Sequence, residues 1–471
     1  MQRKIKFYFL TILLSGTVLF LGASTQNQRN STSNPSPKYI FIFLADGAGV
    51  THMEIARQYS RYIHQEKLII PDKIMKEGSF GLLTTHAADS LSSDSAAAAT
   101  ALASGCKTKP GWIGTCADGS IPTTVMEMAK SRGMRIGLIT NSTVYDASPA
   151  AFAGHVQDRR LHSSIIDQYL KLEPDLLMGG GRDIFLPRTQ PDSRRKDDTD
   201  MIAVFQKQGY VYVTNKEELS RAKANKVLGL FSLRDMSFEL DRDKNVEPSI
   251  YDMTQAAIRL LQEGNKGGFM AFIETENTDS AAHMMDIASL IHDFREFDRA
   301  VGLAYEFYRK HPGETLILVT SDHETGGLAF TMALRDIDPS NPRKQIAGTE
   351  QDLRKIQSIP ISIKKALEIL GPNPTSESVD KLMADYFKGF ILAPDLKKTM
   401  LGKDPVGRTI YSNTVANCLG MMIANNTQAY WATTSHTNHP VFVAALGIGA
   451  ERFRGYQDNT DFAKHIFSLI H

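Results

Sequence analysis

The sequence has little cysteine, almost no net charge and a single long apolar run, and each shortage excludes a class of protein. Three cysteines among 471 residues are too few to build a disulfide-rich scaffold. Lys and Arg number 53 against 52 for Asp and Glu, so no basic field exists and dedicated nucleic-acid binding is not expected. Hydrophobic residues at 42% and charged residues at 22% exclude a disordered chain and a polytopic membrane protein.

The long apolar run lies at the amino end. A basic start, an apolar stretch from Phe7 to about Leu21 and the small residues after it predict a secretory signal peptide over residues 1–24. The alternative is an uncleaved anchor, but the run is short for a membrane span. We therefore expect a periplasmic or secreted protein with no stable membrane span after cleavage. Residues 25–37, rich in Ser, Asn and Pro, are predicted to be a flexible lead-in.

Export makes one disulfide possible. Cys106 and Cys116 flank a turn-rich segment that would let them meet, although two free thiols are the alternative. Cys418 has no evident partner and is predicted to be a buried thiol.

Short, nearly continuous apolar runs alternate with helical patterns along the rest of the chain. Such runs are typical of strands buried on both faces, and the alternation predicts an α/β fold. We expect a doubly wound, mostly parallel central sheet with helices on both faces. The expected strands are residues 39–45, 135–140, 175–178, 268–273, 315–320 and 441–446, and the expected helices include 123–132, 251–263 and one long helix over about 281–310.

Two stretches do not follow this alternation. Residues 188–248 are charged and mixed, and residues about 330–430 hold helical pieces broken by Pro and Gly. We interpret both as insertions on a single α/β domain over residues 38–471, with a cap-like or crown-like role, a dimer contact or neither.

Ionisable residues follow the predicted strands, where open α/β sheets build their sites. Asp279 and His283 are four residues apart, so a helix would place them one turn apart on one face. Asp322 and His323 directly follow another strand, and His436 precedes the last one. Mixed Asp and His ligands suit zinc, and two zinc ions close together suit phosphoryl transfer.

Ser95 is the candidate nucleophile. An alanine-rich run follows it, so Ser95 is expected at a helix N-terminus, where free N–H groups attract anions. The alternative is an ordinary helix-capping serine.

Seven motifs in one order make the chain, from about residue 38 to 455, similar to bacterial alkaline phosphatases and their superfamily. These motifs begin at Asp46-Gly-Ala-Gly, Ser93-Asp-Ser95-Ala, Asp146-Ala-Ser148-Pro with Arg159, Gly179-Gly-Gly, Glu274 with Asp279 and His283, Ser321-Asp322-His323-Glu, and Ser435-His436-Thr.

The resemblance implies a metal-dependent phosphomonoesterase that forms a phosphoserine on Ser95, and it implies a homodimer. Arg159 would bind the phosphate oxygens and Asp94 would orient Arg159. The first zinc would bind Asp279, His283 and His436, the second zinc would bind Asp46, Asp322, His323 and Ser95, and one magnesium ion would bind Asp46, Ser148 and Glu274.

Three positions depart from the family's usual residues. Ser148 replaces threonine and keeps a hydroxyl, and Ser280 replaces the lysine or tryptophan of some members. Asp146 stands where some members have histidine, and a carboxylate at this position would favour magnesium, held through bound water, over a third zinc.

Two other functions stay open at this point. A phosphodiesterase could share the same core, whereas a sulfatase is disfavoured because the residues after Ser95 lack its Ser-x-Pro-x-Arg pattern. A non-catalytic secreted phosphate-binding or metal-binding protein is the alternative from another class.

Overall fold

The computed structural model describes residues 36–331, 348–402 and 414–470. The predicted signal peptide, and all but the end of the predicted lead-in, lie outside these residues. Among the described residues, no helix is both long and apolar enough to cross a bilayer.

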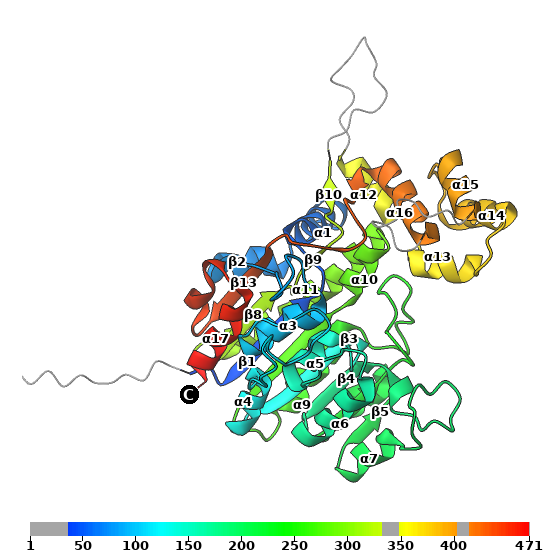
Figure 1. Cartoon of the computed structure of the whole chain (residues 1–471). Helices are drawn as coiled ribbons and strands as arrows, with labels where there is room; N and C mark the ends of the chain where they lie inside the picture. Colours follow the sequence, from blue (N-terminus) through cyan, green and yellow to red (C-terminus); the bar gives the residue numbers. More distant parts are fainter. Residues whose placement is uncertain (1–35, 332–347, 403–413, 471) are drawn as a thin grey trace, which may run out of the picture. The chain divides into compact units, whose positions relative to one another are not determined.

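A central sheet of ten strands organises the described chain (Figure 1). Neighbouring strands are parallel except at β13, which runs antiparallel to both of its neighbours. The predicted mostly parallel α/β fold is therefore confirmed. In spatial order the strands are β14 (Gly455–Gln457), β2 (Ser79–Leu83), β13 (Val441–Gly447), β8 (Thr315–Thr320), β1 (Tyr39–Ala45), β7 (Phe269–Thr275), β3 (Arg135–Thr143), β4 (Leu176–Gly180), β6 (Val227–Leu230) and β5 (Val211–Val213).

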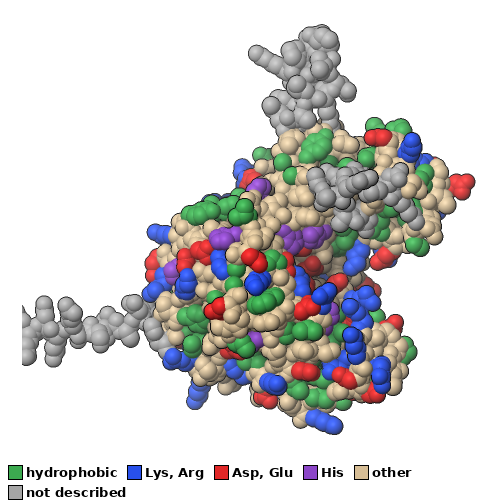
Figure 2. Space-filling view, in the orientation of Figure 1, with side chains coloured by type: hydrophobic (Ala, Val, Ile, Leu, Met, Phe, Trp, Pro, Cys, Tyr) green, Lys and Arg blue, Asp and Glu red, His purple; other side chains and the backbone are tan. Residues whose placement is uncertain are grey.

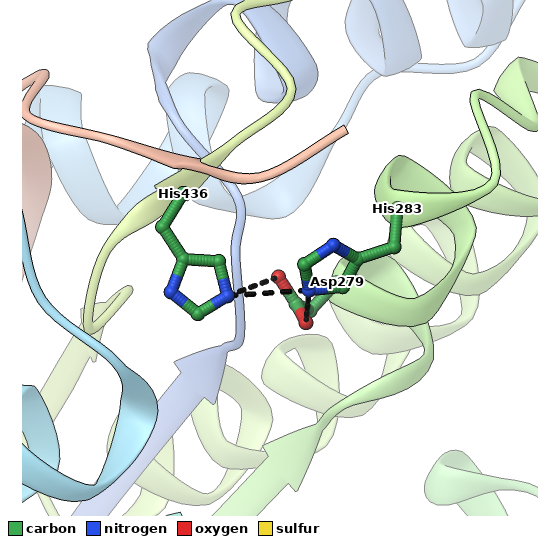
Figure 3. Close-up of side chains that lie close together, drawn as sticks. All are labelled: Asp279, His283 and His436. Carbon is green, nitrogen blue, oxygen red and sulfur yellow. Dashed lines mark hydrogen bonds and ion pairs between the residues drawn. The ribbon is translucent and has the colours of Figure 1, made fainter. Parts of the chain in front are cut away.

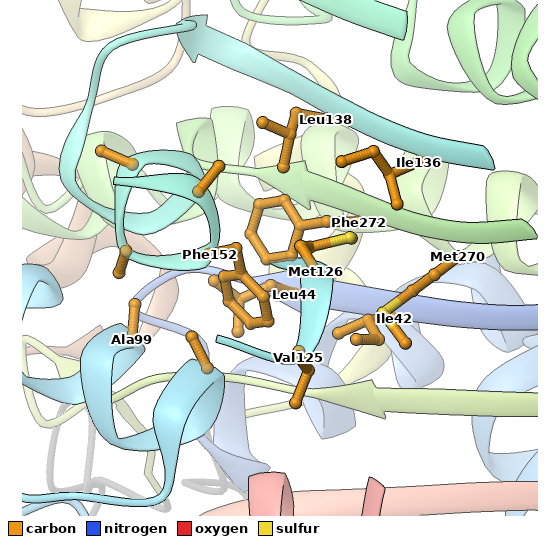
Figure 4. Close-up of a cluster of buried hydrophobic side chains, with 14 of the residues drawn as sticks. Ile42, Leu44, Ala99, Val125, Met126, Ile136, Leu138, Phe152, Met270 and Phe272 are labelled. Atoms are coloured by element: carbon orange, nitrogen blue, oxygen red, sulfur yellow. The ribbon is translucent and has the colours of Figure 1, made fainter. Parts of the chain in front are cut away.

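Strand β1 shows why the sheet is covered on both faces, because all seven of its residues are buried. Ile42 and Leu44 face one hydrophobic layer, which includes Phe152 and Phe272 with ring centroids 4.4 Å apart (Figure 4). The elements that contribute to this layer are α3 (Ser95–Ser104), α4 (Val125–Ser131), α5 (Ala147–Ala153), α6 (His162–Leu172), η2 (Arg182–Ile184), α7 (Met201–Lys207), η3 (Ala450–Phe453) and α17 (Asn459–Leu469).

The alternate residues of β1, among them Phe41 and Phe43, face a second hydrophobic layer on the other side of the sheet. Burial on both sides explains the continuous apolar pattern. This second layer involves α1 (Val50–Ile63), η1 (Ile70–Ile74), α2 (Met75–Glu77), α8 (Lys216–Arg221), α9 (Ile250–Gln262) and α11 (Ile287–Lys310).

The stretch expected as the second insertion is helical where it is described, and a third hydrophobic cluster holds it against α1 and α11. Its role as a cap or dimer contact stays a prediction. Its helices are α12 (Glu350–Gln357), α13 (Ile363–Leu370), α14 (Ser376–Tyr386), α15 (Pro394–Gly402) and α16 (Thr414–Thr427), and the short strand pairs beside them are β10 (Ala329–Phe330) with β11 (Ala429–Tyr430), and β9 (Glu324–Thr325) with β12 (His436–Thr437).

Two expectations need correction. Residues 188–248 do not stand outside the alternation, because they supply β5 and β6 to the same sheet, with α7 before β5 and α8 between β5 and β6. The long helix expected over 281–310 is two helices, α10 (Asn277–His283) and α11, because Met285 between them adopts a φ of 61°. A left-handed residue cannot continue a right-handed helix.

Of the two alternatives for Cys106 and Cys116, the structure contains the disulfide: Cys106 is bonded to Cys116. Cys418 is a buried free thiol, as predicted.

Candidate active site

Ser95 is the first residue of helix α3 and is only 7% exposed. The preceding residue, Asp94, caps the helix by accepting a hydrogen bond from the Ala97 N–H at 3.0 Å. Because Asp94 serves as the cap, Ser95 is not an ordinary capping serine, and its hydroxyl is left for other contacts. Its Oγ lies 3.2 Å from Nε2 of His323. The predicted nucleophile therefore lies at a helix N-terminus, beside a predicted metal ligand.

Asp279, His283 and His436 form one cluster, called here the outer group (Figure 3). Nε2 of His283 lies 3.0 Å from Oδ2 of Asp279 and 3.2 Å from Nε2 of His436. The other ring nitrogens contact backbone carbonyls, with Nδ1 of His283 2.5 Å from the Thr434 oxygen and Nδ1 of His436 2.7 Å from the Ser93 oxygen. When a neutral histidine ring donates to a carbonyl through Nδ1, its Nε2 carries no proton and can bind a cation.

The field of the Asp279 carboxylate governs the outer group. It raises the pKa of His283 to about 9. Burial alone would raise the pKa of Asp279, but His283 and His436 lower it below its usual value. Without a metal ion, a proton on His283 can balance this carboxylate.

Asp46, Asp322 and His323 form the second cluster, the inner group. All three side chains are at most 2% exposed, and Nε2 of His323 lies 3.5 Å from Asp46 Oδ1 and 3.2 Å from Asp322 Oδ2. These two carboxylate oxygens accept no hydrogen bond from the described residues. Burial, reinforced by Asp322, raises the pKa of Asp46 well above its usual value, and burial lowers the pKa of His323. Unpaired buried carboxylates are costly, so this donor set fits a divalent cation.

Asp46 also joins the inner group to a set of oxygen donors. The Ser148 hydroxyl donates to Asp46 Oδ2 at 3.3 Å. Glu274 is 1% exposed, and its Oε2 has no hydrogen-bond partner among the described residues. Burial raises the pKa of Glu274 to about 8. Hydroxyl and carboxylate oxygens are the ligands that magnesium prefers.

Two carboxylates hold Arg159, whose side chain is 32% exposed. Nη1 donates to Asp94 at 3.3 Å and Nη2 donates to Asp146 at 2.9 Å. Asp146 also accepts from the Ser142 hydroxyl at 3.0 Å, and it caps helix α5. The guanidinium plane is therefore fixed from two sides, as a two-oxygen phosphate contact requires.

Sheet topology explains why these residues meet. Neighbouring strands β8, β1, β7 and β3 are parallel, and the site residues that they carry, or that follow them, lie at their carboxyl ends. His436 precedes a strand, but that strand is β13, whose antiparallel direction puts its start at the same edge. On the face shown in Figure 2, histidine and acidic side chains gather near the middle of the molecule.

Two further residues around the outer group were not among those predicted from the sequence. The Thr325 hydroxyl donates to Asp279 Oδ1, and the Thr437 hydroxyl, next to His436, donates to Glu324. A signal existed for Thr325, because it stands two residues after His323 and alternate residues of an extended segment share a face. Ser280, one of the family departures, donates to Glu276 at 2.8 Å.

Gly47 forms the turn that follows Asp46. Its φ is 67°, and a Cβ atom at this position would overlap the Asp279 side chain. Its N–H also approaches Asp322 Oδ1 at 3.3 Å. Only glycine fits this close passage between the two groups.

Known proteins resemble the chain over nearly its full length. "Alkaline phosphatase 4" of Bacillus subtilis is 29% identical over 477 residues, covering 98% of this chain and 95% of that protein. The crystal structure of Thermus thermophilus alkaline phosphatase superposes with a TM-score of 0.83 at 27% identity, covering 96% of this chain and 95% of the other. The cold-active alkaline phosphatase of Shewanella gives a TM-score of 0.73 at 27% identity, covering 92% of this chain and 100% of the other.

The family description "Alkaline phosphatase" matches residues 37–471, which include every site residue described above. With this match, the similar structures and the two clusters of metal-binding residues, the chain belongs to the alkaline phosphatase family of phosphomonoesterases.

Proposed function

We propose that this phosphomonoesterase acts on small phosphate monoesters outside the cytoplasm through a phosphoserine formed on Ser95. The observation that carries the proposal is the 3.2 Å approach of Ser95 Oγ to His323 Nε2, which puts the hydroxyl against the inner group. The helix N-terminus adds free N–H groups and a favourable dipole for an anion at the same place.

The donor sets support two zinc ions and one magnesium ion. The outer group offers two imidazole nitrogens and a carboxylate, and the inner group offers one imidazole and two carboxylates, with the Ser95 hydroxyl alongside. Asp46, Ser148 and Glu274 offer oxygen donors alone, which suit magnesium, and Asp146 would contact that ion through water. When bound, these cations supply positive charge that favours ionisation of a hydroxyl or a water near neutral pH.

The chain's own residues then divide the reaction into two displacements. Ser95 Oγ gives its proton to solvent and bonds to phosphorus, while the bond from phosphorus to the ester oxygen breaks and the leaving alkoxide takes a proton from solvent to depart as the alcohol. A water molecule next attacks the phosphoserine, its oxygen bonds to phosphorus, and Ser95 regains its hydroxyl as phosphate leaves.

Arg159 binds two oxygens of the phosphoryl group in both displacements. Asp94 and Asp146 accept from different nitrogens of its fork, so the guanidinium is oriented before the substrate arrives. Lysine cannot give this planar two-point contact.

Export and assembly belong to the same proposal. The amino-terminal pattern and the Cys106–Cys116 disulfide support a periplasmic or secreted protein, because disulfides persist in oxidising compartments. The homodimer rests on the family alone. Cell fractionation and the molar mass in solution test these two points.

Ser95→Ala tests the mechanism. Turnover of a phosphate monoester should fall by about 10³-fold or more, while zinc and magnesium contents stay unchanged. Ser131→Ala, at a serine on the surface of α4, is the control and should keep full activity. Near-normal turnover by Ser95→Ala would exclude Ser95 as the nucleophile.

A substrate comparison tests the reaction class. We expect the parent protein to hydrolyse a phosphate monoester far faster than the matching diester. A preference for the diester would instead favour the phosphodiesterase alternative.

A further inference from the structure

The loop closed by the Cys106–Cys116 disulfide runs beside the nucleophile helix. Cys106 follows Gly105, the residue that ends α3. The loop then reaches the opposite end of the helix, where the Gly111 N–H donates to Asp94 Oδ2 at 2.9 Å. A ten-residue helix is about 15 Å long, so the loop spans the length of α3.

The same loop also holds the segment that carries Arg159. The Arg159 N–H donates to the Gly111 carbonyl at 2.8 Å. Ile113 and Val156 exchange two backbone hydrogen bonds of 2.8 and 2.9 Å. Gly111 thus contacts both partners of the phosphate-binding pair, the Asp94 side chain and the Arg159 backbone.

Close backbone packing makes this bridge stiff. The Gly114 N–H donates to Thr100 Oγ1 of α3 at 2.9 Å, and its carbonyl lies 2.5 Å from Nδ1 of His155. Gly114 has a φ of 55°, and a Cβ atom there would overlap the Gly154 carbonyl. Since the Gly114 backbone packs directly against the Gly154 backbone, a displaced loop would move the segment that carries Arg159.

We infer that the Cys106–Cys116 disulfide is a positioning device for the phosphate-binding arginine. It fixes both ends of the loop at the far end of α3, and the loop transmits that restraint to Asp94 and Arg159. The inference rests on the proposed function, in which Arg159 binds phosphate. The competing explanation is a disulfide that only stabilises the fold.

The double variant Cys106→Ser/Cys116→Ser tests the inference, with Cys418→Ser as the control at a buried free thiol. The inhibition constant of inorganic phosphate should rise about fivefold in the double variant, because a misplaced guanidinium makes poorer charge-assisted hydrogen bonds. KM for a monoester should rise with it, and zinc content should stay unchanged. Cys418→Ser should keep the parent inhibition constant.

The Arg159→Ala background separates positioning from general stability. Without the guanidinium, removing the disulfide should leave the phosphate inhibition constant unchanged, because the two changes act through one contact. An equal weakening in both backgrounds would overturn the inference. So would an unchanged inhibition constant accompanied only by a lower melting temperature.

Reduction of the folded protein covers the case in which the double variant does not fold. A phosphine reductant converts the disulfide to two thiols and is itself oxidised to the phosphine oxide. It avoids added thiols, which bind zinc. The same rise in the phosphate inhibition constant is expected, and no rise would overturn the inference.

Measurements on the parent protein distinguish failure of the proposed function from failure of the positioning role. A parent with no monoesterase turnover contradicts the proposed function. An active, phosphate-inhibited parent whose disulfide can be removed without effect contradicts only the positioning role.

Discussion

The outer and inner groups lie next to each other, yet they satisfy their charges differently. Outer-group side chains reach the surface, with His283 37% and His436 18% exposed, and the described contacts already occupy their remaining polar atoms. The inner group is at most 2% exposed, and two of its carboxylate oxygens have no hydrogen-bond partner among the described residues. Protons and water can balance the outer group, whereas the buried inner group needs either a cation or protons held on its own carboxylates.

This difference assigns different physical roles to two similar donor sets. A buried, unpaired pair of carboxylates destabilises the fold until a cation neutralises it, so binding at the inner group is coupled to stability. The outer group is prepared by backbone carbonyls before any ion binds, and solvent can reach it. Exchange with solvent would suit the proposed reaction, in which an alcohol leaves and water enters.

The largest contrast is expected between Asp322→Asn and His436→Gln. Asp322→Asn should lower turnover by more than about 100-fold. Loss of a contact behind a metal ligand already costs roughly 10- to 100-fold, and Asp322 would bind the metal ion itself. His436→Gln should cost less, about tenfold at saturating zinc, since water can replace an exposed ligand. Steady-state kinetics over a zinc titration measures both.

A buried carboxylate elsewhere provides the control for Asp322→Asn. Asp298 accepts from the Ile69 and Ile70 N–H groups at 2.8 Å, so both of its carboxylate oxygens already have hydrogen-bond partners. Asp298→Asn should lower stability and leave turnover unchanged. If His436→Gln were the more damaging of the two site variants, the distinction between the groups would be wrong.

The second contrast concerns the metal-free protein and pH. Burial, with the charge of Asp279, raises the pKa of Asp322 to about 6, against about 3.9 in an unfolded chain. Between these values the folded state keeps a proton that the unfolded state has released. Stability of the metal-free protein should therefore fall as pH rises from about 4 to about 6, and it should continue to fall toward pH 8 because burial raises the pKa of Glu274 to about 8.

Denaturant unfolding of chelator-treated protein at pH 5 and pH 8 measures this effect. Adding zinc should restore most of the stability lost at pH 8, since the cation then takes the place of the proton. Equal metal-free stability at both values would show that the inner carboxylates are balanced in some other way.

The two groups also show how much of the site could be predicted from the sequence. Asp322 and His323 follow an apolar strand, so their place at the sheet edge was predictable from the pattern alone. His436 was the exception because it precedes its strand, and only the antiparallel direction of β13 resolves that exception. Strand direction depends on long-range pairing, which no local pattern encodes.

The wrong predictions have the same origin, which is long-range contact that the local sequence does not encode. The helix break at Met285 follows from a backbone conformation that methionine rarely adopts, so tertiary packing overrides local helix propensity there. Residues 188–248 carry too many charges to read as sheet, yet Val227 and Leu228 form a buried strand because β4 stands beside them. The Thr325 hydroxyl was not predicted to act in the site, because its hydrogen-bond partner Asp279 is 46 residues away in the sequence.

Thr325→Val gives the smallest effect and the finest test of the two groups. Valine keeps the shape of threonine but removes the hydroxyl that donates to Asp279 Oδ1. Zinc affinity of the outer group should fall about tenfold, the lower end for loss of a contact behind a metal ligand, while the inner group keeps its affinity. Thr325→Ser, which retains the hydroxyl, should behave like the parent. Competition with a colorimetric chelator resolves the two sites, because only the weaker step should move.

A loss at both steps would mean that the Thr325 hydroxyl, which also lies 3.3 Å from His323 Nδ1, supports the inner group too. The separation between the groups would then hold for burial and charge but not for their supporting contacts.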